Sequence, residues 1–101
     1  MPSSFKLVRD KIPDIIREEG RTPRTRVVRA KAYKQALLQK LQEEVDELSA
    51  APSKEEAADV LEVLHALCLA YGIPLSEVEK VRKAKVRKRG GFSRGIVLEQ
   101  V

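Results

Sequence analysis

The chain has 101 residues, of which 43% are apolar and only four are aromatic, and its formal net charge is +5. A chain of this length holds one domain, residues 1–101, whose core is small enough for partner subunits to add useful burial. It has no long apolar run and no basic leader before an apolar stretch, so we expect no membrane span, no signal peptide and a cytoplasmic location. The single cysteine, Cys68, excludes an internal disulfide and is expected to be a small buried apolar side chain.

The charges are unevenly distributed along the chain. Eight of the fifteen acidic residues fall within residues 43–62, where the only basic residue is Lys54. Seven basic residues lie within residues 21–40, and eight lie within residues 80–94. An acidic region between basic segments suits a polyanion that binds together with a divalent metal ion.

The first predicted element is a short helix that has Pro13 in its first turn, carries three isoleucines within residues 12–16 and ends at Gly20. A basic stretch follows, in which the two valines at residues 27–28 favour a brief extended segment. Residues 95–98 near the C-terminus have a similar character. We therefore predict a short β pairing between these two segments.

A longer helix is predicted from about residue 32 to residue 48, because its apolar residues recur at helical spacing. They form one stripe: Leu37, Leu38, Leu41, Val45 and Leu48. At about 100° per residue, Glu44 falls about 20° from Leu37, at the edge of the buried face. A charged side chain beside a core stripe needs an explanation that a solvated one does not.

The third predicted helix begins at Ser53 and is followed by Gly72 and Pro74. It is apolar on nearly every side within residues 57–71, which is typical of a central, covered helix. Only a short break, residues 49–52, separates it from the second helix, so the two helices should fold back antiparallel. The sequence thus predicts an all-α helical bundle of about four helices around a central antiparallel pair.

The last predicted helix starts at a capping box formed by Ser76 and Glu79 and reaches about residue 89. It is basic and amphipathic. Its three valines are expected to face inward: Val78, Val81 and Val86.

Two carboxylate pairs flank the break between the central helices. Glu44 and Glu47 lie three residues apart on the second helix, and Glu56 and Asp59 do so on the third. Residues three apart share a helix face, and in an antiparallel pair position 44 is level with 59 and position 47 with 56. Four carboxylates at one height repel one another unless cations lie between them, which predicts a metal site.

Both carboxylate pairs also have simpler interpretations. The acidic run of residues 43–47 is compatible with a solvated helix face. Lys40, one turn before Glu44, can neutralise it by an i,i+4 pair. Ser53 and Glu56 also match a capping box, in which the Glu56 side chain reaches back to its own helix terminus.

A bound cation would offset two unfavourable placements. Glu44 and Glu47 lie at the C-terminal end of their helix, where the macrodipole disfavours anions by a few tenths to about 1 kcal/mol each. Asp59 lies in the least polar helix of the chain, where an unpaired carboxylate is expensive. Oxygen-only ligands indicate Mg²⁺ or Mn²⁺ rather than zinc. Such an ion, with a carboxylate that orients or deprotonates a water, is equipment for hydrolysing a phosphoanhydride.

The acidic residues also match a known signature. Glu43-Glu44-x-x-Glu47 followed by Glu56-x-x-Asp59 resembles the EExxE…ExxD motif of the all-α nucleoside triphosphate pyrophosphohydrolases, the MazG-like group that includes phosphoribosyl-ATP pyrophosphohydrolase. The gap between the two halves of the motif is shorter here than in many members.

The match extends beyond the motif. Residues 6–13, 58–64 and 88–92 resemble the compact subgroup of predicted house-cleaning NTP pyrophosphatases. The resemblance implies a dimer or higher oligomer and a nucleotide substrate that is cleaved between its α and β phosphates, giving a monophosphate and pyrophosphate. It leaves the identity of the nucleotide open.

The resemblance also assigns roles to the acidic residues. It implies Mg²⁺ ligands at Glu44, Glu47, Glu56 and Asp59, and it implies that Glu43 supports these ligands or acts as a candidate base. The candidate catalytic residues are therefore Glu43, Glu44 and Glu47.

Basic residues outside the acidic region are the candidate substrate ligands, because guanidinium groups bind phosphate oxygens bidentately and a glycine pair lets backbone amides approach them. They are Arg9 and Lys11 near the N-terminus, and Lys85, Arg89 and Arg94 near the Gly90-Gly91 turn. His65 has no partner ligand and is expected to pack or to face solvent.

Two other functions fit parts of the sequence. A pI near 9.6 and the basic last helix suit a nucleic-acid-binding module, although no aromatic platform is visible. A helical oligomerisation module without catalysis is the second alternative, and the complete carboxylate set argues against it.

Overall fold

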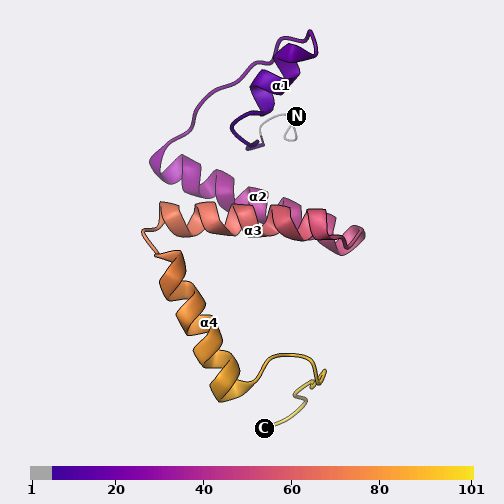
Figure 1. Cartoon of the computed structure of the whole chain (residues 1–101), viewed down its shortest axis with the longest axis vertical. Coiled ribbons are helices and arrows are strands. Elements are labelled where there is room, and N and C mark those ends of the chain that lie inside the picture. The colour runs from indigo at the N-terminus through magenta and orange to yellow at the C-terminus, as the bar shows by residue number, and fades with distance from the viewer. Residues whose placement is uncertain (1–5) are drawn as a thin grey trace.

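The computed structural model describes residues 6–101, which contain four helices and no strand (Figure 1). The helices are α1 (Ile12–Glu18), α2 (Ala30–Ala50), α3 (Lys54–Ala70) and α4 (Leu75–Arg89). The prediction of an all-α fold is confirmed. The predicted β pairing of residues 27–28 with residues 95–98 does not form, because the link before α2 and the C-terminal tail lie on opposite sides of the central helices.

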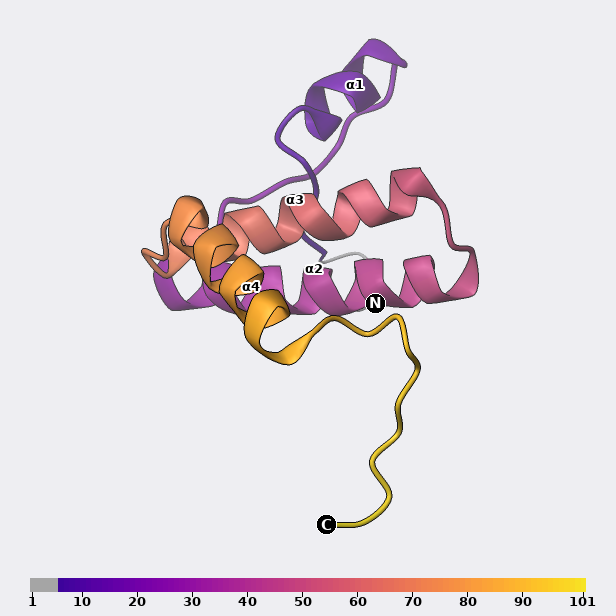
Figure 2. The same cartoon turned by 60° about the horizontal axis from the view of Figure 1, so that its bottom comes forward.

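The centre of the fold is the antiparallel pair of α2 and α3, as predicted (Figure 2). Residues 51–53 join the two helices, and the Ser53 hydroxyl caps α3 by accepting a hydrogen bond from the Glu56 N–H at 3.1 Å. Leu37 of α2 is 2% exposed and Cys68 of α3 is 8% exposed, and they are the buried apolar side chains of the described residues. The small apolar core of the described residues therefore lies between α2 and α3.

The start of α4 differs from the prediction. The helix begins one residue before Ser76, its N-cap residue is Pro74, and no side chain caps it. Glu79 instead pairs along the helix with Arg82 at 2.7 Å and with Lys83 at 3.9 Å. These ion pairs give the Glu79 carboxylate partners that a capping box does not offer.

The direction of α4 also changes the fate of its valines. The chain bends by 115° between α3 and α4, so α4 leaves the central pair instead of lying along it. Val78, Val81 and Val86 are 36%, 53% and 45% exposed, and the prediction that they face inward is wrong. A helical pattern specifies an apolar face, but no helix within residues 6–101 buries that face.

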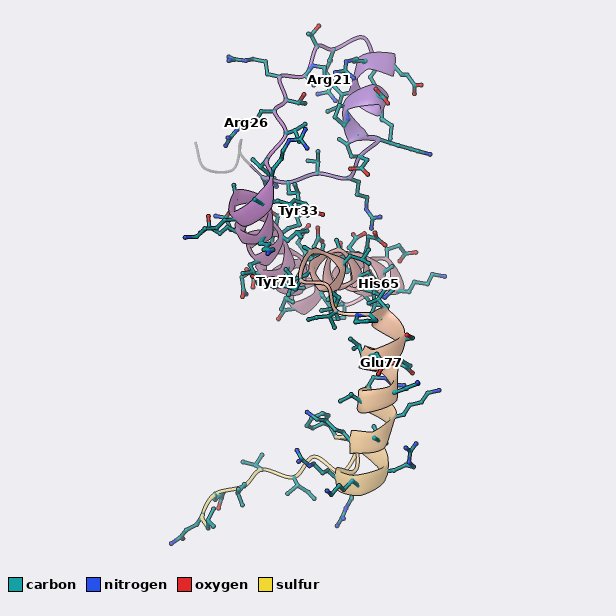
Figure 3. All side chains as sticks on the ribbon, turned by 90° about the vertical axis from the view of Figure 1, so that its left-hand side faces the viewer. Arg21, Arg26, Tyr33, His65, Tyr71 and Glu77 are labelled. Atoms are coloured by element: carbon teal, nitrogen blue, oxygen red, sulfur yellow. The ribbon has the colours of Figure 1, made fainter. Side chains whose placement is uncertain are left out.

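The helices outside the pair make few contacts. Among the described residues, α1 packs on no other helix and α4 packs on α3 alone. Figure 3 looks along the central pair and shows α1 and α4 on opposite sides of it. The radius of gyration is 17.5 Å, against roughly 13 Å for a compact domain of this length. The chain is therefore extended, and large apolar side chains such as Leu69 and Phe92 are exposed.

Within residues 6–101, no single helix has both the length and the apolar character needed to cross a membrane. Only α3 and α4 taken together, with the bend between them, meet those two criteria.

Candidate metal centre

The predicted ligands meet where α2 ends and α3 begins. One carboxylate oxygen from each of Glu44, Glu56 and Asp59 lies within 4.8 Å of the others, and the same holds for Glu43, Glu44 and Glu47. Glu44 belongs to both groups. We call these five residues the acidic cluster. The structure thus groups Glu44 with Glu56 and Asp59 across the two helices, whereas Glu47 is grouped with Glu43 and Glu44 on α2.

Glu44 is the buried member of the acidic cluster, with 7% of its surface exposed. It shares a face of α2 with Leu37, which packs against α3, and this explains why the helix pair covers it. Lys40 meets its charge: Lys40 Nζ lies 3.2 Å from Glu44 Oε2 and donates a 2.8 Å hydrogen bond to Glu43 Oε1. The predicted i,i+4 pair is confirmed, and Lys40 pairs with Glu43 and Glu44 but not with the other three members of the acidic cluster.

Glu56 presents an unsatisfied oxygen to the same region. Its Oε2 atom is buried and has no hydrogen-bond partner among the described residues. Only half of the predicted capping box forms, because the Ser53 hydroxyl accepts from the Glu56 N–H while this carboxylate oxygen binds nothing. A buried carboxylate oxygen without a partner is costly, and a cation would satisfy it.

The pKa values of two neighbouring carboxyls diverge. The charge of Glu44 raises the pKa of Glu47, and desolvation and the charge of Glu56 add to this effect. The hydrogen bond from Lys40 lowers the pKa of Glu43. The negative charge of Glu43 is thus balanced by Lys40, whereas the negative charge of Glu47 is repelled by the carboxylates of Glu44 and Glu56. A cluster of oxygen donors with this excess negative charge fits a hard divalent ion such as Mg²⁺ or Mn²⁺.

Replacing Glu47 by Gln should stabilise the metal-free protein at pH 7. Because folding raises the pKa of Glu47, its contribution to stability is present at low pH and is lost as the pH rises through that pKa. We therefore expect Glu47→Gln to raise the Tm at pH 7 in a chelator, and the gain to vanish below about pH 4, where wild-type Glu47 is protonated. Differential scanning calorimetry across this pH range measures both effects.

Glu55→Gln is the matched control for this experiment. Glu55 lies in the first turn of α3, outside the acidic cluster, where the macrodipole favours a carboxylate. Its replacement should bring no gain in Tm. A lower Tm for Glu47→Gln at pH 7 would contradict the proposed repulsion.

Two cations of the N-terminal segment, residues 6–11, reach the acidic cluster. Arg9 Nη2 donates a 2.7 Å hydrogen bond to Asp59 Oδ1, and Lys6 Nζ lies 3.7 Å from Glu43 Oε1. The segment lies between α1 and the central pair (Figure 1). Arg9 was predicted as a substrate ligand, but its contact with Asp59 was not, because no local pattern links positions fifty apart. Lys6 was missed for the same reason.

The other predicted substrate ligands lie elsewhere in this chain. Lys11 is the N-cap residue of α1 and follows Arg9 by two positions. Lys85 and Arg89 are on α4, which packs on α3 alone and has its ion pairs within itself, and Arg94 follows the Gly90-Gly91 turn. The structure does not bring these three side chains to the acidic cluster. His65 is exposed on α3 (Figure 3), in agreement with its predicted role outside the site.

Comparison with known proteins adds little to this geometry. An uncharacterized protein of Mycolicibacterium smegmatis is 48% identical to the chain over 54 residues, which are 54% of this chain and 55% of that protein. The chain thus matches about half the length of this relative. No family model matches the chain, and no solved structure matches it. Evidence for a function therefore comes from the acidic cluster and its surroundings.

Proposed function

We propose that this protein is a Mg²⁺-dependent nucleotide pyrophosphohydrolase, with Mn²⁺ as a second suitable ion. It would cleave the α–β phosphoanhydride of a nucleoside triphosphate, or of a related phosphoribosyl nucleotide, to a monophosphate and pyrophosphate. The observation that carries the proposal is that two sets of three neighbouring carboxylates both contain the buried Glu44. The resemblance of the sequence to the EExxE…ExxD motif supports the reaction class.

The proposed ligands are Glu44, Glu47, Glu56 and Asp59. Their chemistry fits the ion because all donors are carboxylate oxygens and because Glu56 Oε2 lacks any other partner. When bound, a divalent ion neutralises phosphate oxygens and makes a bound water more acidic. The burial of Glu44 would fix the position of the ligand set.

Glu43 has a different proposed task. Its carboxylate lies close to those of Glu44 and Glu47. Two lysines, Lys40 and Lys6, contact its Oε1 atom. The Lys40 hydrogen bond lowers the pKa of Glu43, which favours the charged form that accepts hydrogen bonds. We assign it the orientation of the attacking water, since a weak base orients a water more readily than it deprotonates one.

The proposal includes a homodimer or higher homo-oligomer. Exposed apolar side chains on α3, α4 and the tail, among them Leu69, Val81 and Phe92, and the extended shape of the chain support it. Arg9 and Lys11 would bind substrate phosphates from within the chain. Lys85, Arg89 and Arg94 would do so only from another copy, since α4 leads away from the acidic cluster of its own chain.

Similarity to the compact house-cleaning subgroup over three segments supports noncanonical nucleotides as substrates. We place the activity in the cytoplasm, as the sequence analysis favours.

Release of pyrophosphate from a panel of normal and damaged nucleoside triphosphates tests the proposed function. We expect release from at least one nucleotide with Mg²⁺ and none in EDTA. Inorganic phosphate is measured in parallel, because cleavage between the β and γ phosphates would release phosphate instead. Absence of metal-dependent pyrophosphate from every nucleotide would contradict the proposal.

The basic helix supports one alternative, a nucleic-acid-binding module. Seven of the fifteen residues of α4 are lysine or arginine, and none of them is buried. Phosphate binding by such a helix is salt-dependent and needs no metal. A gel shift that persists in EDTA and disappears at high salt, together with no pyrophosphate release, would favour this alternative.

A further inference from the structure

The contact between Arg9 and Asp59 is a hydrogen bond that ties the N-terminal segment, residues 6–11, to α3. Arg9 Nη2 and Asp59 Oδ1 are 2.7 Å apart, although fifty positions separate the residues. Lys6 of the same segment approaches Glu43 on α2 at 3.7 Å. These two contacts place the charged side chains of the segment beside the acidic cluster.

Arg9 contacts a carboxylate that the proposed metal site also uses. The carboxylate of Asp59 lies within 4.8 Å of those of Glu44 and Glu56. Its Oδ1 atom already accepts the hydrogen bond from the Arg9 guanidinium. A guanidinium and a divalent ion on one carboxylate repel each other. The two cations therefore compete for Asp59.

The Arg9–Asp59 ion pair can separate at little cost in buried surface. The Arg9 side chain is 57% exposed and the Asp59 side chain is 37% exposed, so separating them uncovers no core. Exposed ion pairs of this kind contribute little free energy and are readily replaced. Lys40 differs, because its side chain is 17% exposed and it holds Glu43 and Glu44 together. Of the cations at the acidic cluster, Arg9 is the exchangeable one that contacts a proposed ligand.

We propose that Arg9 is a displaceable counter-ion of Asp59: a divalent cation replaces it there, and the freed guanidinium binds a phosphate oxygen of the substrate. The inference rests on the proposed function and assigns Arg9 two successive partners. It couples the two binding steps, since Arg9 becomes available to bind phosphate only after the metal ion has replaced it at Asp59. An arginine suits the second partner because its planar fork binds phosphate oxygens bidentately.

Removing the arginine should therefore change metal and phosphate binding in opposite directions. In the first arm, Mn²⁺ is titrated into the wild-type protein, Arg9→Gln and Lys6→Gln, and its Kd is measured by calorimetry. Lys6→Gln removes the same charge from the same segment but frees no proposed ligand. We expect about fivefold tighter Mn²⁺ binding for Arg9→Gln and less than about twofold for Lys6→Gln, as the loss of an exposed ion pair suggests.

In the second arm, inorganic pyrophosphate is titrated into the same proteins with saturating Mg²⁺ in both solutions. We expect Arg9→Gln to weaken pyrophosphate binding about tenfold, the effect of losing one charge-assisted hydrogen bond. Arg17→Gln is the remote control, because Arg17 pairs with Asp14 on α1 and touches no member of the acidic cluster. It should leave the pyrophosphate Kd unchanged.

The outcomes separate this inference from the proposed function. Equal changes of Mn²⁺ affinity in Arg9→Gln and Lys6→Gln would overturn the exchange at Asp59 and leave the metal site standing. Weaker Mn²⁺ binding by Arg9→Gln, or unchanged pyrophosphate binding, would also overturn it. No Mn²⁺ binding by the wild-type protein would overturn the inference and the proposed function together.

Discussion

Glu44→Gln is expected to lower metal-dependent pyrophosphate release by at least about 100-fold, more than the usual loss on removing an outer partner of a metal ligand. Glu44 belongs to both sets of three neighbouring carboxylates, so its replacement takes one oxygen donor from each set. It is also 7% exposed, and a neutral amide in its place leaves no room for another carboxylate to substitute. A coupled assay of pyrophosphate with the best nucleotide of the panel measures the loss.

Asp46→Asn is the matched control for Glu44→Gln. Asp46 is two positions further along α2, is exposed, accepts a hydrogen bond from Gln42 and belongs to neither carboxylate group. Its replacement removes the same charge and should retain more than about half of the activity, as expected for a surface substitution. Equal losses in the two variants would mean that the general acidity of α2, and not a defined ligand set, supports the reaction.

Leu37→Ala is expected to lower the free energy of unfolding by about 2–5 kcal/mol, the range for truncating a buried leucine. Leu37 is 2% exposed, the lowest value among the described residues, and it lies on the face of α2 that meets α3. The loss is large beside the total stability of a small domain, about 5–15 kcal/mol. Urea unfolding followed by circular dichroism measures it.

Leu38→Ala makes the same chemical change one position away. Leu38 is 48% exposed, so its replacement should lower the free energy of unfolding by less than about 1 kcal/mol. The unfolding is followed at several protein concentrations, because burial of Leu38 in an assembly would make its loss grow with concentration. A Leu37→Ala protein as stable as the wild type would show that the α2–α3 contact does not hold the chain together.

The parts of the fold that follow from short-range chemistry could be predicted. The position of Glu44 beside Leu37 follows from helical spacing, and the structure buries both. The Ser53 cap follows from the start of an apolar run after a short break, and it forms. Lys40 one turn before Glu44 gives an i,i+4 pair, and this pair also forms. Each of these features depends on residues within two turns of one another.

The features that depend on distant partners could not be predicted. Arg9 meets Asp59 across fifty positions, and no periodicity marks such a pair. Residues 27–28 have β propensity, but a strand needs an adjacent edge, and no other strand forms within the described part of the chain. Helical spacing puts the three valines of α4 near one another, whereas among the described residues α3 is the one helix that packs on α4 and leaves these valines exposed. In each case the sequence specifies one surface and leaves its partner undetermined.

The short link between α2 and α3 has a consequence for how the acidic cluster first assembles during folding. Residues 44 and 59 lie in one helical hairpin, so their carboxylates can meet without any other segment of the chain in place. Closing so short a loop takes on the order of 100 ns and carries a small entropic penalty. In a refolding chain, the hairpin would therefore assemble its carboxylates before the N-terminal segment docks on it, and a bound cation would then act as a nucleation partner for the pair.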